Sequence, residues 1–336
     1  MNVNKSNNKS KINAALIGYG MGGRVFHAPI ISSIPGFNLA KIYTTKQESA
    51  EKAKSLYPDC EIVNDTKDIF SDDSIELVAI ATTNQTHFPL AFEALNAGKH
   101  VVVDKPFTVT SHEADQLIET AEKNNRIISV FHNRRWDADF RTVKKVIESG
   151  MLGNIVECEI HFDRFRNYFK NSWKEADLPG SGLLYDIGSH LIDQAQCLFG
   201  EPSYITADLR KQRPGSRAVD NFELILDYGS TKVVLKAGML VKEPLPHFIV
   251  LGDKGSFVKY GMDIQEADLN AGLTPMTKLN WGEEPKENYG TINMIVNGLN
   301  VRGQVESLPG DYREYYRNIY EAIALGAELE VTSQQA

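Results

Sequence analysis

The segment INAALIGYGMGG, residues 12–23, joins a short apolar run to a turn rich in glycine. The apolar run predicts a buried strand, and the residues after the turn have the pattern of a helix. The glycines fall at the spacing G-x-G-x-x-G as Gly18, Gly20 and Gly23. Gly18 permits a tight turn, Gly20 lets a pyrophosphate approach the backbone, and Gly23 allows the helix to pack closely on the strand. The segment therefore predicts the start of a parallel sheet that binds a dinucleotide at a helix N-terminus.

The same alternation of strand and helix continues to about residue 130. Strands are expected at residues 12–20, 37–45, 75–83, 100–106 and 126–132, and helices at residues 48–57, 88–98 and 111–125. The strand segments are almost wholly apolar, as in strands that are buried on both faces. Ser111 is the expected N-cap of the last of these helices. This order predicts an α/β fold that begins with a Rossmann domain, a doubly wound parallel sheet with right-handed crossovers.

The pattern changes after a helix expected at residues 137–150. Strands are expected at residues 154–165, 203–211, 221–229, 231–240 and 247–261, with a helix at residues 182–200 and a tyrosine-rich core helix at residues 311–326. Short turns separate most of these strands, which is typical of an antiparallel sheet. The sequence therefore predicts an NAD(P)-binding domain at residues 1–130 and a C-terminal α+β domain at residues 131–336, for substrate binding and oligomerisation.

Composition and charge exclude several classes of protein. The 336 residues carry a formal net charge of −8, which argues against a nucleic-acid surface. No segment reaches the roughly 18 apolar residues of a membrane span, and the polar N-terminus lacks the apolar core of a signal peptide. The cysteines, at Cys60, Cys158 and Cys197, have no C-x-x-C spacing and predict neither disulfides nor a zinc site. We therefore expect a cytoplasmic protein without a structural metal.

The end of the second strand bears on the choice of dinucleotide. NAD sites usually carry an acidic residue about 20 residues beyond the glycines, where it binds the ribose 2′-hydroxyl. Here the strand ends in Thr44, Thr45 and Lys46, and the first acidic residue is Glu48. Two hydroxyls and an ammonium can bind a 2′-phosphate, which a carboxylate would repel. The sequence therefore favours NADP over NAD, with NAD as the alternative.

Two further stretches carry ionisable residues in an apolar context. DKPF places Lys105 at the carboxyl end of a predicted strand, where open α/β sheets bind ligands. GLLYDIGSH places Asp186 and His190 four residues apart, which puts both side chains on one face of a helix. Taken alone, each has a structural interpretation: a solvated lysine in a turn, an aspartate at a helix start and a histidine satisfied in the core. Together with the glycine turn, the three features predict an active site.

In combination, GYGMGG, DKPF and SGLLYDIGSH resemble the three motifs of the Gfo/Idh/MocA oxidoreductase family, over nearly the whole chain. FHAPI, FHNRRWDADF and LYDIGSHLIDQ are similar to the branch of NADP-dependent scyllo-inositol dehydrogenases. Two positions depart from the family pattern. Asp104 stands where the family has glutamate, which shortens that side chain by one carbon. Ser181 stands where the third motif begins with glycine. In the family the Lys-Pro bond is often cis, which Lys105–Pro106 could share.

The resemblance implies reversible hydride transfer between a secondary alcohol and nicotinamide. His190 would be the general base, Asp186 would orient the substrate, and Lys105 would hydrogen-bond the reacting oxygen. The expected substrate is a cyclic polyol or sugar, with scyllo-inositol and scyllo-inosose first. An aldose or keto-sugar dehydrogenase is the alternative enzyme. A regulator that senses NADP without catalysis is the alternative outside enzymes, because the family includes corepressors.

The remaining expectations concern other site residues and assembly. The residues expected to bind the cofactor are Gly18, Tyr19, Gly20, Met21, Gly22, Gly23, Thr44, Thr45, Lys46, Thr82, Thr83, Asn84, His87, Asp104, Lys105 and Pro106. Those expected near the substrate are Asn133, Arg134, Trp136, Tyr168 and Trp173. No metal site is expected. Because an antiparallel sheet with one uncovered face often buries it against another subunit, a homodimer or homotetramer is expected.

Overall fold

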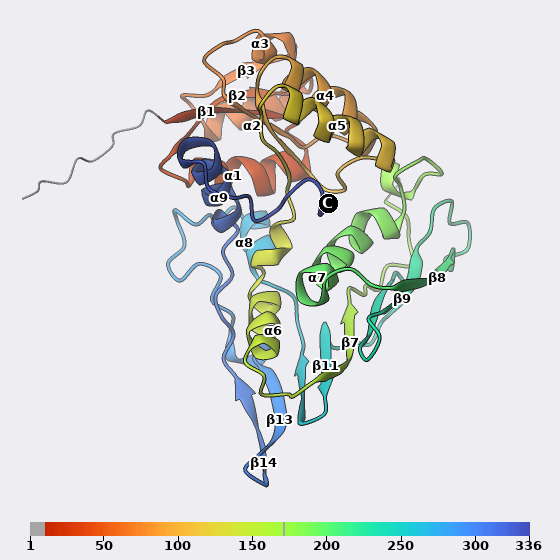
Figure 1. Cartoon of the computed structure of the whole chain (residues 1–336). Helices are drawn as coiled ribbons and strands as arrows, with labels where there is room; N and C mark the ends of the chain where they lie inside the picture. Colours follow the sequence, from red (N-terminus) through yellow and green to blue (C-terminus); the bar gives the residue numbers. More distant parts are fainter. Residues whose placement is uncertain (1–10, 171) are drawn as a thin grey trace, which may run out of the picture. The chain divides into compact units, whose positions relative to one another are not determined.

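A computed structural model describes residues 11–170 and 172–336. The chain forms two compact units, and each is described by itself. Unit 1 contains the described residues up to 131 together with residues 269–278 and 313–336. Unit 2 contains residues 132–268, apart from residue 171, and residues 279–312. Figure 1 shows the elements of both units along the chain.

Unit 1 is built on the predicted parallel sheet. Within the described residues its strands have the order β3-β2-β1-β4-β5-β6, and every neighbouring pair is parallel. The strands are β1 (Ile12–Ile17), β2 (Phe37–Tyr43), β3 (Glu61–Val63), β4 (Leu77–Ile80), β5 (His100–Val103) and β6 (Ile128–Val130). The strand order reverses between β1 and β4, and doubly wound sheets bind ligands at the carboxyl ends of the strands beside such a reversal.

One face of this sheet packs against helices that follow β3, β4 and β5. Its core joins strand residues such as Val78 and Val101 to Ala91, Leu95 and Leu117 of the helices. These helices are α3 (Lys67–Phe70), α4 (Asn84–Asn96) and α5 (Ser111–Lys123), and α2 (Gln47–Leu56) follows β2.

The N-terminus of α5 corrects the expected cap. The N-cap is Thr110, and Ser111 is the first residue of the helix. Thr110 accepts a hydrogen bond from the Glu113 amide, and the Glu113 side chain accepts one from the Thr110 amide, which completes a capping box. The reciprocal pair satisfies two amides at once, which explains why the helix begins at Ser111, one residue earlier than a cap at Ser111 would allow.

Aromatic residues of the last helix, α9 (Arg313–Leu325), also belong to the core of unit 1. α9 packs against α1 (Ala28–Ser32), which follows the glycine turn. Tyr315 and Tyr316 are buried and lie against Phe131, with ring centroids 4.9 and 5.6 Å apart. The tyrosine-rich segment therefore forms core, as the sequence predicts.

Unit 2 is built on a mixed sheet that is mainly antiparallel. Within the described residues its strand order is β14-β13-β12-β11-β7-β10-β9-β8, and β7 pairs with β10 in parallel. The strands are β7 (Ile155–His161), β8 (Tyr204–Arg210), β9 (Asn221–Asp227), β10 (Lys232–Gly238), β11 (Phe248–Gly252), β12 (Gly255–Lys259), β13 (Gly290–Val296) and β14 (Leu299–Val305). The pairing of β7 with β10 explains why the long segment between them can hold a helix, since parallel neighbours need a crossover.

Two helices cover one face of this sheet. α6 (Ala138–Glu148) and α7 (Ser189–Phe199) contribute Phe140, Val143 and Leu191 to a core shared with Cys158 and Leu224 of the strands. The opposite face is polar in its centre, where Lys232 pairs with Glu157 and Lys236 pairs with Glu223. The alternation of apolar and polar residues along β7, β9 and β10 thus separates a covered face from an uncovered one.

Short helical segments complete the fold. They are the π-helical η1 (Gly22–His27) and η4 (Leu184–Gly188), the 3₁₀ turns η2 (Asn133–Trp136), η3 (Trp173–Glu175) and η5 (Lys286–Asn288), and α8 (Gln265–Asn270). Both π-helical segments run directly into an α-helix, and each lies in one of the motifs that the sequence analysis singled out. Such segments are frequent at functional sites. Among residues 11–170 and 172–336, no helix is long and apolar enough to cross a membrane.

Candidate active site

The glycines of GYGMGG form a backbone cradle at the carboxyl end of β1. Gly18 has φ of +100°, and a Cβ there would lie 2.6 Å from the Ala81 carbonyl oxygen. A Cβ on Gly23 would collide with the Gly18 carbonyl oxygen. A Cβ on Gly20, by contrast, would meet no atom within 4 Å. Gly18 and Gly23 are therefore required by the fold, and Gly20 leaves the backbone open to a ligand, which fits a dinucleotide pyrophosphate.

The other residues of this turn differ in their surroundings. Tyr19 is buried, and burial raises the pKa of its phenol to about 12. Met21 is exposed. A Cβ on Gly22 would lie 2.7 Å from the Asp104 carboxylate, so Gly22 allows the turn to approach the end of β5.

The residues after β2 present hydroxyls and a cation. Thr44 is mostly buried, and its hydroxyl accepts a hydrogen bond from the Lys46 amide at 3.3 Å. Thr45 and Lys46 are exposed, and α2 begins at the next residue, Gln47. An exposed ammonium and hydroxyl beside a helix N-terminus form a donor set that suits a phosphate group.

The loop after β4 is tied to the end of β5. His87 is buried, and its Nδ1 lies 2.9 Å from the carbonyl oxygen of Pro106. Burial lowers the pKa of His87, so the imidazole is neutral and donates a hydrogen bond from Nδ1 to that carbonyl. Asn84 is also buried, whereas the hydroxyl of Thr82 accepts a hydrogen bond from Thr86 at 2.7 Å. Thr83 is the N-cap residue of α4.

Asp104 fixes the backbone beside Lys105. Its Oδ1 accepts a hydrogen bond from the Lys105 amide at 2.8 Å, and its Oδ2 lies 3.8 Å from Nε2 of His27. Burial alone would raise the pKa of Asp104, but the interaction with His27 and the charge of Lys105 lower it to about 2. The carboxylate is therefore ionised at neutral pH. The Lys105–Pro106 peptide bond is cis.

His27 links this strand end to the last helix. The imidazole is fully buried, its Nδ1 lies 2.6 Å from the Tyr316 hydroxyl of α9, and its ring centroid is 4.3 Å from that of Phe131. Two histidines thus fix the Asp104–Pro106 segment, His27 through the carboxylate and His87 through the carbonyl. Both histidines lie outside the three motifs, although His27 belongs to the FHAPI stretch.

Asp186 and His190 lie on consecutive helical segments of unit 2. Asp186 is in η4, and its carboxylate accepts a hydrogen bond from the Lys174 ammonium at 2.5 Å. His190 is in the first turn of α7 and is 5% exposed. Gly182, which precedes η4, has φ of +89°, and a Cβ there would press on the Val219 backbone at 3.1 Å. The π-helical turn therefore keeps a carboxylate and an imidazole within one turn of each other.

The candidate substrate residues fall into two groups. Asn133, Arg134 and Trp136 are buried in η2, whereas Tyr168 is 59% exposed and Trp173 is partly buried in η3. The Tyr168 backbone carbonyl accepts a hydrogen bond from Arg213, which fixes the loop rather than the side chain.

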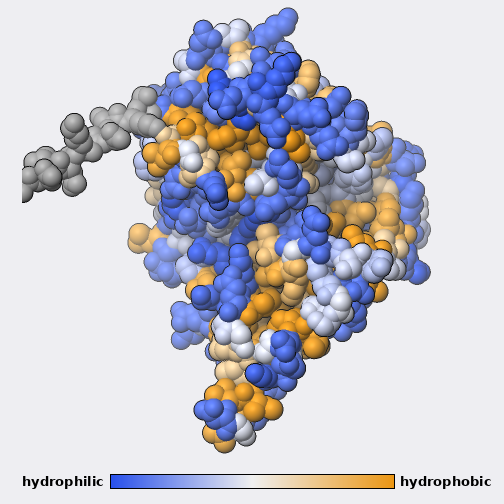
Figure 2. Space-filling model, in the orientation of Figure 1, coloured by the Kyte–Doolittle hydropathy of each residue, from blue (hydrophilic) through white to orange (hydrophobic). Residues whose placement is uncertain are grey.

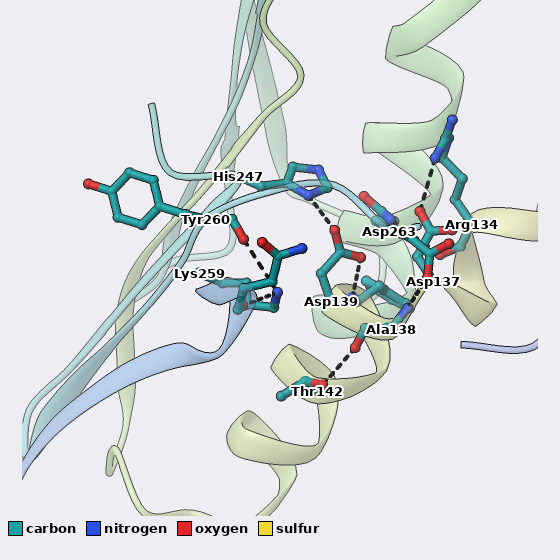
Figure 3. Close-up of polar contacts among 12 residues, drawn as sticks. Arg134, Asp137, Ala138, Asp139, Thr142, His247, Lys259, Tyr260 and Asp263 are labelled. Atoms are coloured by element: carbon teal, nitrogen blue, oxygen red, sulfur yellow. Dashed lines mark hydrogen bonds and ion pairs between the residues drawn. The ribbon is translucent and has the colours of Figure 1, made fainter. Parts of the chain in front are cut away.

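The side chain of Arg134 is part of a buried ionic cluster at the start of α6, shown in Figure 3. Its guanidinium binds the Asp137 carboxylate at 3.1 Å and also binds Glu266. Nearby, Asp139 accepts a hydrogen bond from His247 at 2.7 Å, and Asp263 accepts one from the Ala138 amide. Burial and the neighbouring Asp139 raise the pKa of Asp263 to about 6.

Two cations act on Asp186, and no pattern in the sequence predicts this. Lys174 of η3 pairs with Asp186, which lies twelve residues further along the chain. Arg164 follows β7 and acts electrostatically on the same carboxylate. Each belongs to a polar segment in which lysine and arginine are common. Only the folded chain brings them to Asp186.

The fold and these residues define an oxidoreductase with an NAD(P)-binding Rossmann domain. Residues 12–132 match the oxidoreductase family model for the NAD-binding Rossmann fold, and residues 144–336 match the model for the C-terminal alpha/beta domain of the same family. The chain belongs to the Gfo/Idh/MocA oxidoreductase family.

Relatives extend over nearly the whole chain. It is 42% identical to the uncharacterized oxidoreductase YdgJ of Escherichia coli, covering 97% of this chain and 92% of that one. It is 38% identical to scyllo-inositol 2-dehydrogenase (NADP(+)) IolW of Bacillus subtilis, covering 96% and 89%. Among solved structures, the oxidoreductase yvaA of Bacillus subtilis has a TM-score of 0.93 at 38% identity, covering 97% of this chain and 92% of that chain. The relatives therefore include an inositol dehydrogenase.

Proposed function

We propose that the protein is an NADP-dependent dehydrogenase that oxidises a secondary hydroxyl of a cyclic polyol or sugar, with scyllo-inositol as the first candidate. The observation that carries the proposal is the placement of Asp186 and the buried His190 on consecutive helical segments, in a chain that also has a Rossmann domain with its glycine cradle. The relative IolW, a scyllo-inositol 2-dehydrogenase, supports the choice of substrate class.

In this proposal the residues of the chain remove the hydroxyl proton and stabilise the reacting oxygen. His190 accepts the hydroxyl proton, the role that imidazole side chains most often have in general acid–base catalysis. Asp186 binds substrate hydroxyls and supports the charged form of His190. Lys105 donates a hydrogen bond to the reacting oxygen and stabilises the negative charge that develops there. Bound nicotinamide supplies the hydride acceptor.

We assign the cofactor-binding role to the residues around the glycine cradle. The turn from Gly18 to Gly23 would hold the pyrophosphate, and Thr44, Thr45 and Lys46 would bind the 2′-phosphate of NADP. Thr82, Thr83, Asn84 and His87 would lie on the nicotinamide side together with the segment from Asp104 to Pro106. The exposed ammonium of Lys46 supports NADP over NAD, and the name of IolW agrees with that choice.

We assign residues 1–130 to cofactor binding and residues 131–336 to substrate binding. Within the second part, Asn133, Arg134, Trp136, Tyr168 and Trp173 are the candidate substrate neighbours. For Arg134 the ionic cluster around it supports a role in fixing η2.

The test is to incubate the purified protein with NADP or NAD and a panel of inositols and aldoses, and to follow NADPH or NADH by absorbance. The proposal expects turnover with a cyclic polyol or sugar and a lower Michaelis constant for NADP than for NAD. Turnover confined to aldoses would favour the alternative enzyme. Tight NADP binding without turnover on any member of the panel would favour a sensor and contradict the proposal.

We also propose that the protein is a homodimer or homotetramer that associates through unit 2. Apolar side chains are exposed at both edges of its sheet: Tyr204, Ile205 and Leu209 on β8, and Leu299 and Val301 on β14. Figure 2 shows hydrophobic residues gathered at the tip of the β13–β14 hairpin. Exposed apolar edges are typical of interfaces. Light scattering at micromolar concentration should give at least twice the monomer mass, and a monomer would contradict this.

A further inference from the structure

Arg164 has a fixed backbone and a side chain directed by an aromatic ring. It follows β7, its amide donates to the Gly238 carbonyl at 2.9 Å, and its carbonyl accepts from the Val241 amide at 3.0 Å. The guanidinium carbon lies 5.0 Å from the ring centroid of Phe162. The side chain is only partly exposed. The sheet and Phe162 therefore hold this cation in a defined place.

Within residues 11–170 and 172–336, the guanidinium of Arg164 has no hydrogen bond and no carboxylate at ion-pair distance. Other arginines of unit 2 have carboxylate partners: Arg134 binds Asp137 and Glu266, Arg135 binds Asp193, and Arg213 binds Asp220. A partly buried cation without an anion is unusual, because burial disfavours an uncompensated charge. The five donors of Arg164 are available to a ligand.

The carboxylates that act on Arg164 already have other partners. Asp186 is the main negative group that acts on Arg164, but Lys174 already pairs with its carboxylate. Arg166 and Arg134 add repulsion, and burial together with these cations lowers the pKa of Arg164. Glu266 also attracts Arg164, but it already binds Arg134. Arg164 therefore has no carboxylate of its own among the described residues, and a ligand that brings one negative charge would compensate it.

We infer that the substrate is a polyol or sugar that carries a carboxylate, and that Arg164 binds this carboxylate while Asp186 and His190 face the reacting hydroxyl. The inference rests on the proposed function and narrows its substrate class to sugar acids, which replace the uncharged scyllo-inositol as the first candidate. A guanidinium matches the two oxygens of a carboxylate with two parallel hydrogen bonds. A carboxylate also suits a site with one uncompensated guanidinium better than a phosphate ester, which brings more charge.

The test compares sugars that differ only in this group. D-Glucose and D-glucuronate, and D-galactose and D-galacturonate, are assayed with NADP, and D-glucose 6-phosphate is a third arm. The wild-type protein should prefer each acid, by kcat/KM, over its neutral partner. Arg164→Gln should reduce this preference by about 10- to 100-fold, as expected for the loss of a charged hydrogen bond. Arg164→Lys keeps the positive charge but loses the planar guanidinium. Its preference for the acid should lie between that of the wild-type protein and that of Arg164→Gln.

Arg210→Gln is the matched control. Arg210 is an exposed arginine on β8 that pairs with Asp208, so its loss removes the same charge without touching Asp186. The preference of Arg210→Gln for each acid over its neutral partner, by kcat/KM, should equal that of the wild-type protein. A second readout is calorimetric binding of D-glucuronate to the NADP-loaded protein, which should weaken in Arg164→Gln by the same factor.

The outcomes separate the two proposals. Equal kcat/KM for acids and neutral sugars, or an unchanged preference in Arg164→Gln, would overturn the inference while turnover upholds the proposed function. A preference for D-glucose 6-phosphate over D-glucuronate would also overturn it. Arg164-dependent binding of D-glucuronate without turnover would support the inference and contradict the proposed dehydrogenase. The absence of both binding and turnover would overturn both the inference and the proposed function.

Discussion

In the proposed function, the choice between NADP and NAD depends on Lys46. It is exposed, it precedes the first turn of α2, and its positive charge suits a 2′-phosphate. In Lys46→Glu, a carboxylate would repel that phosphate and could bind the ribose hydroxyl instead. We expect the ratio of the Kd values for NADP and NAD to rise by about 10- to 100-fold, since a charge-assisted hydrogen bond is replaced by repulsion.

The control for this experiment is Lys52→Glu, which makes the same charge change at an exposed position further along α2. Titration of both dinucleotides, followed by fluorescence or calorimetry, measures the ratio. An unchanged ratio in Lys46→Glu, or an equal change in Lys52→Glu, would remove Lys46 from cofactor selection.

We propose that His27 positions Lys105, and His27→Gln tests that role. The imidazole holds the Asp104 carboxylate, which in turn accepts the Lys105 amide. Without His27, burial dominates and the pKa of Asp104 rises from about 2. We expect kcat to fall about tenfold through misplacement of the lysine, with a small change in the KM for NADP. The acid limb of the kcat–pH profile should also move to higher pH, because Asp104 then becomes protonated in a range where it was ionised.

A merely structural histidine would lower stability and leave this acid limb unchanged. Tyr316→Phe is the comparison, since it removes the other partner of His27 and leaves the Asp104 contact in place. An unchanged pH profile in His27→Gln would contradict the positioning role.

The role of a residue was predictable from the sequence where it depends only on nearby residues in the chain. The steric need for Gly18 and Gly23 follows from the spacing of the motif, and the structure shows the collisions that enforce it. Arg164 and His27 were missed as site residues because their importance lies in what the fold places beside them. No spacing rule brings residue 164 to residue 186, or residue 27 to residue 104.

His100 of β5, beside the start of β6, is a histidine whose protonation lowers the free energy of unfolding. His100 accepts a hydrogen bond from the Ile127 amide at 3.0 Å through Nδ1, so this nitrogen carries no hydrogen. Burial, and then the charge of Arg126, lower the pKa of His100 to about 4. The unfolded chain therefore binds a proton near pH 6.5, and the folded chain does so only near pH 4. The free energy of unfolding should fall as the pH decreases across this range.

His100→Asn isolates this contribution, because the amide oxygen of asparagine can accept the same hydrogen bond and does not titrate. Urea unfolding at pH 7 and pH 4.5 should show a smaller loss of stability in the variant than in the wild-type protein. Equal losses in both proteins would show that His100 is not buried in its neutral form.

Among the elements, apolar strands were easier to predict than polar ones. β1, β2, β4, β5 and β6 are apolar segments at the expected positions. β3 and β14 were not predicted, because β3 has three residues and β14 has Asn, Arg, Gly and Gln among its seven residues; β13 was also missed. The expected helix at residues 182–200 exists, but it opens with a π-helical turn, which changes the register of Asp186 and leaves no trace in hydrophobic periodicity.

For the whole chain, the change from alternating strands and helices to successive strands predicts both sheets. It does not predict that α9, at the end of the chain, packs against α1 in unit 1. That packing depends on aromatic contacts such as Phe37 with Tyr316, whose ring centroids are 6.1 Å apart across most of the sequence. Contacts between residues so distant in sequence are set by the fold and have no local pattern.

The central claim is that Lys105 and the Asp186–His190 pair serve one reaction. Its most direct test is the turnover number of Lys105→Ala and His190→Ala with NADP and the best polyol or sugar, measured beside the Kd for NADP. Each variant should lose turnover by a factor of about 10² to 10⁴ and keep its affinity for NADP within a few-fold. Turnover equal to that of the wild-type protein in either variant would contradict the account.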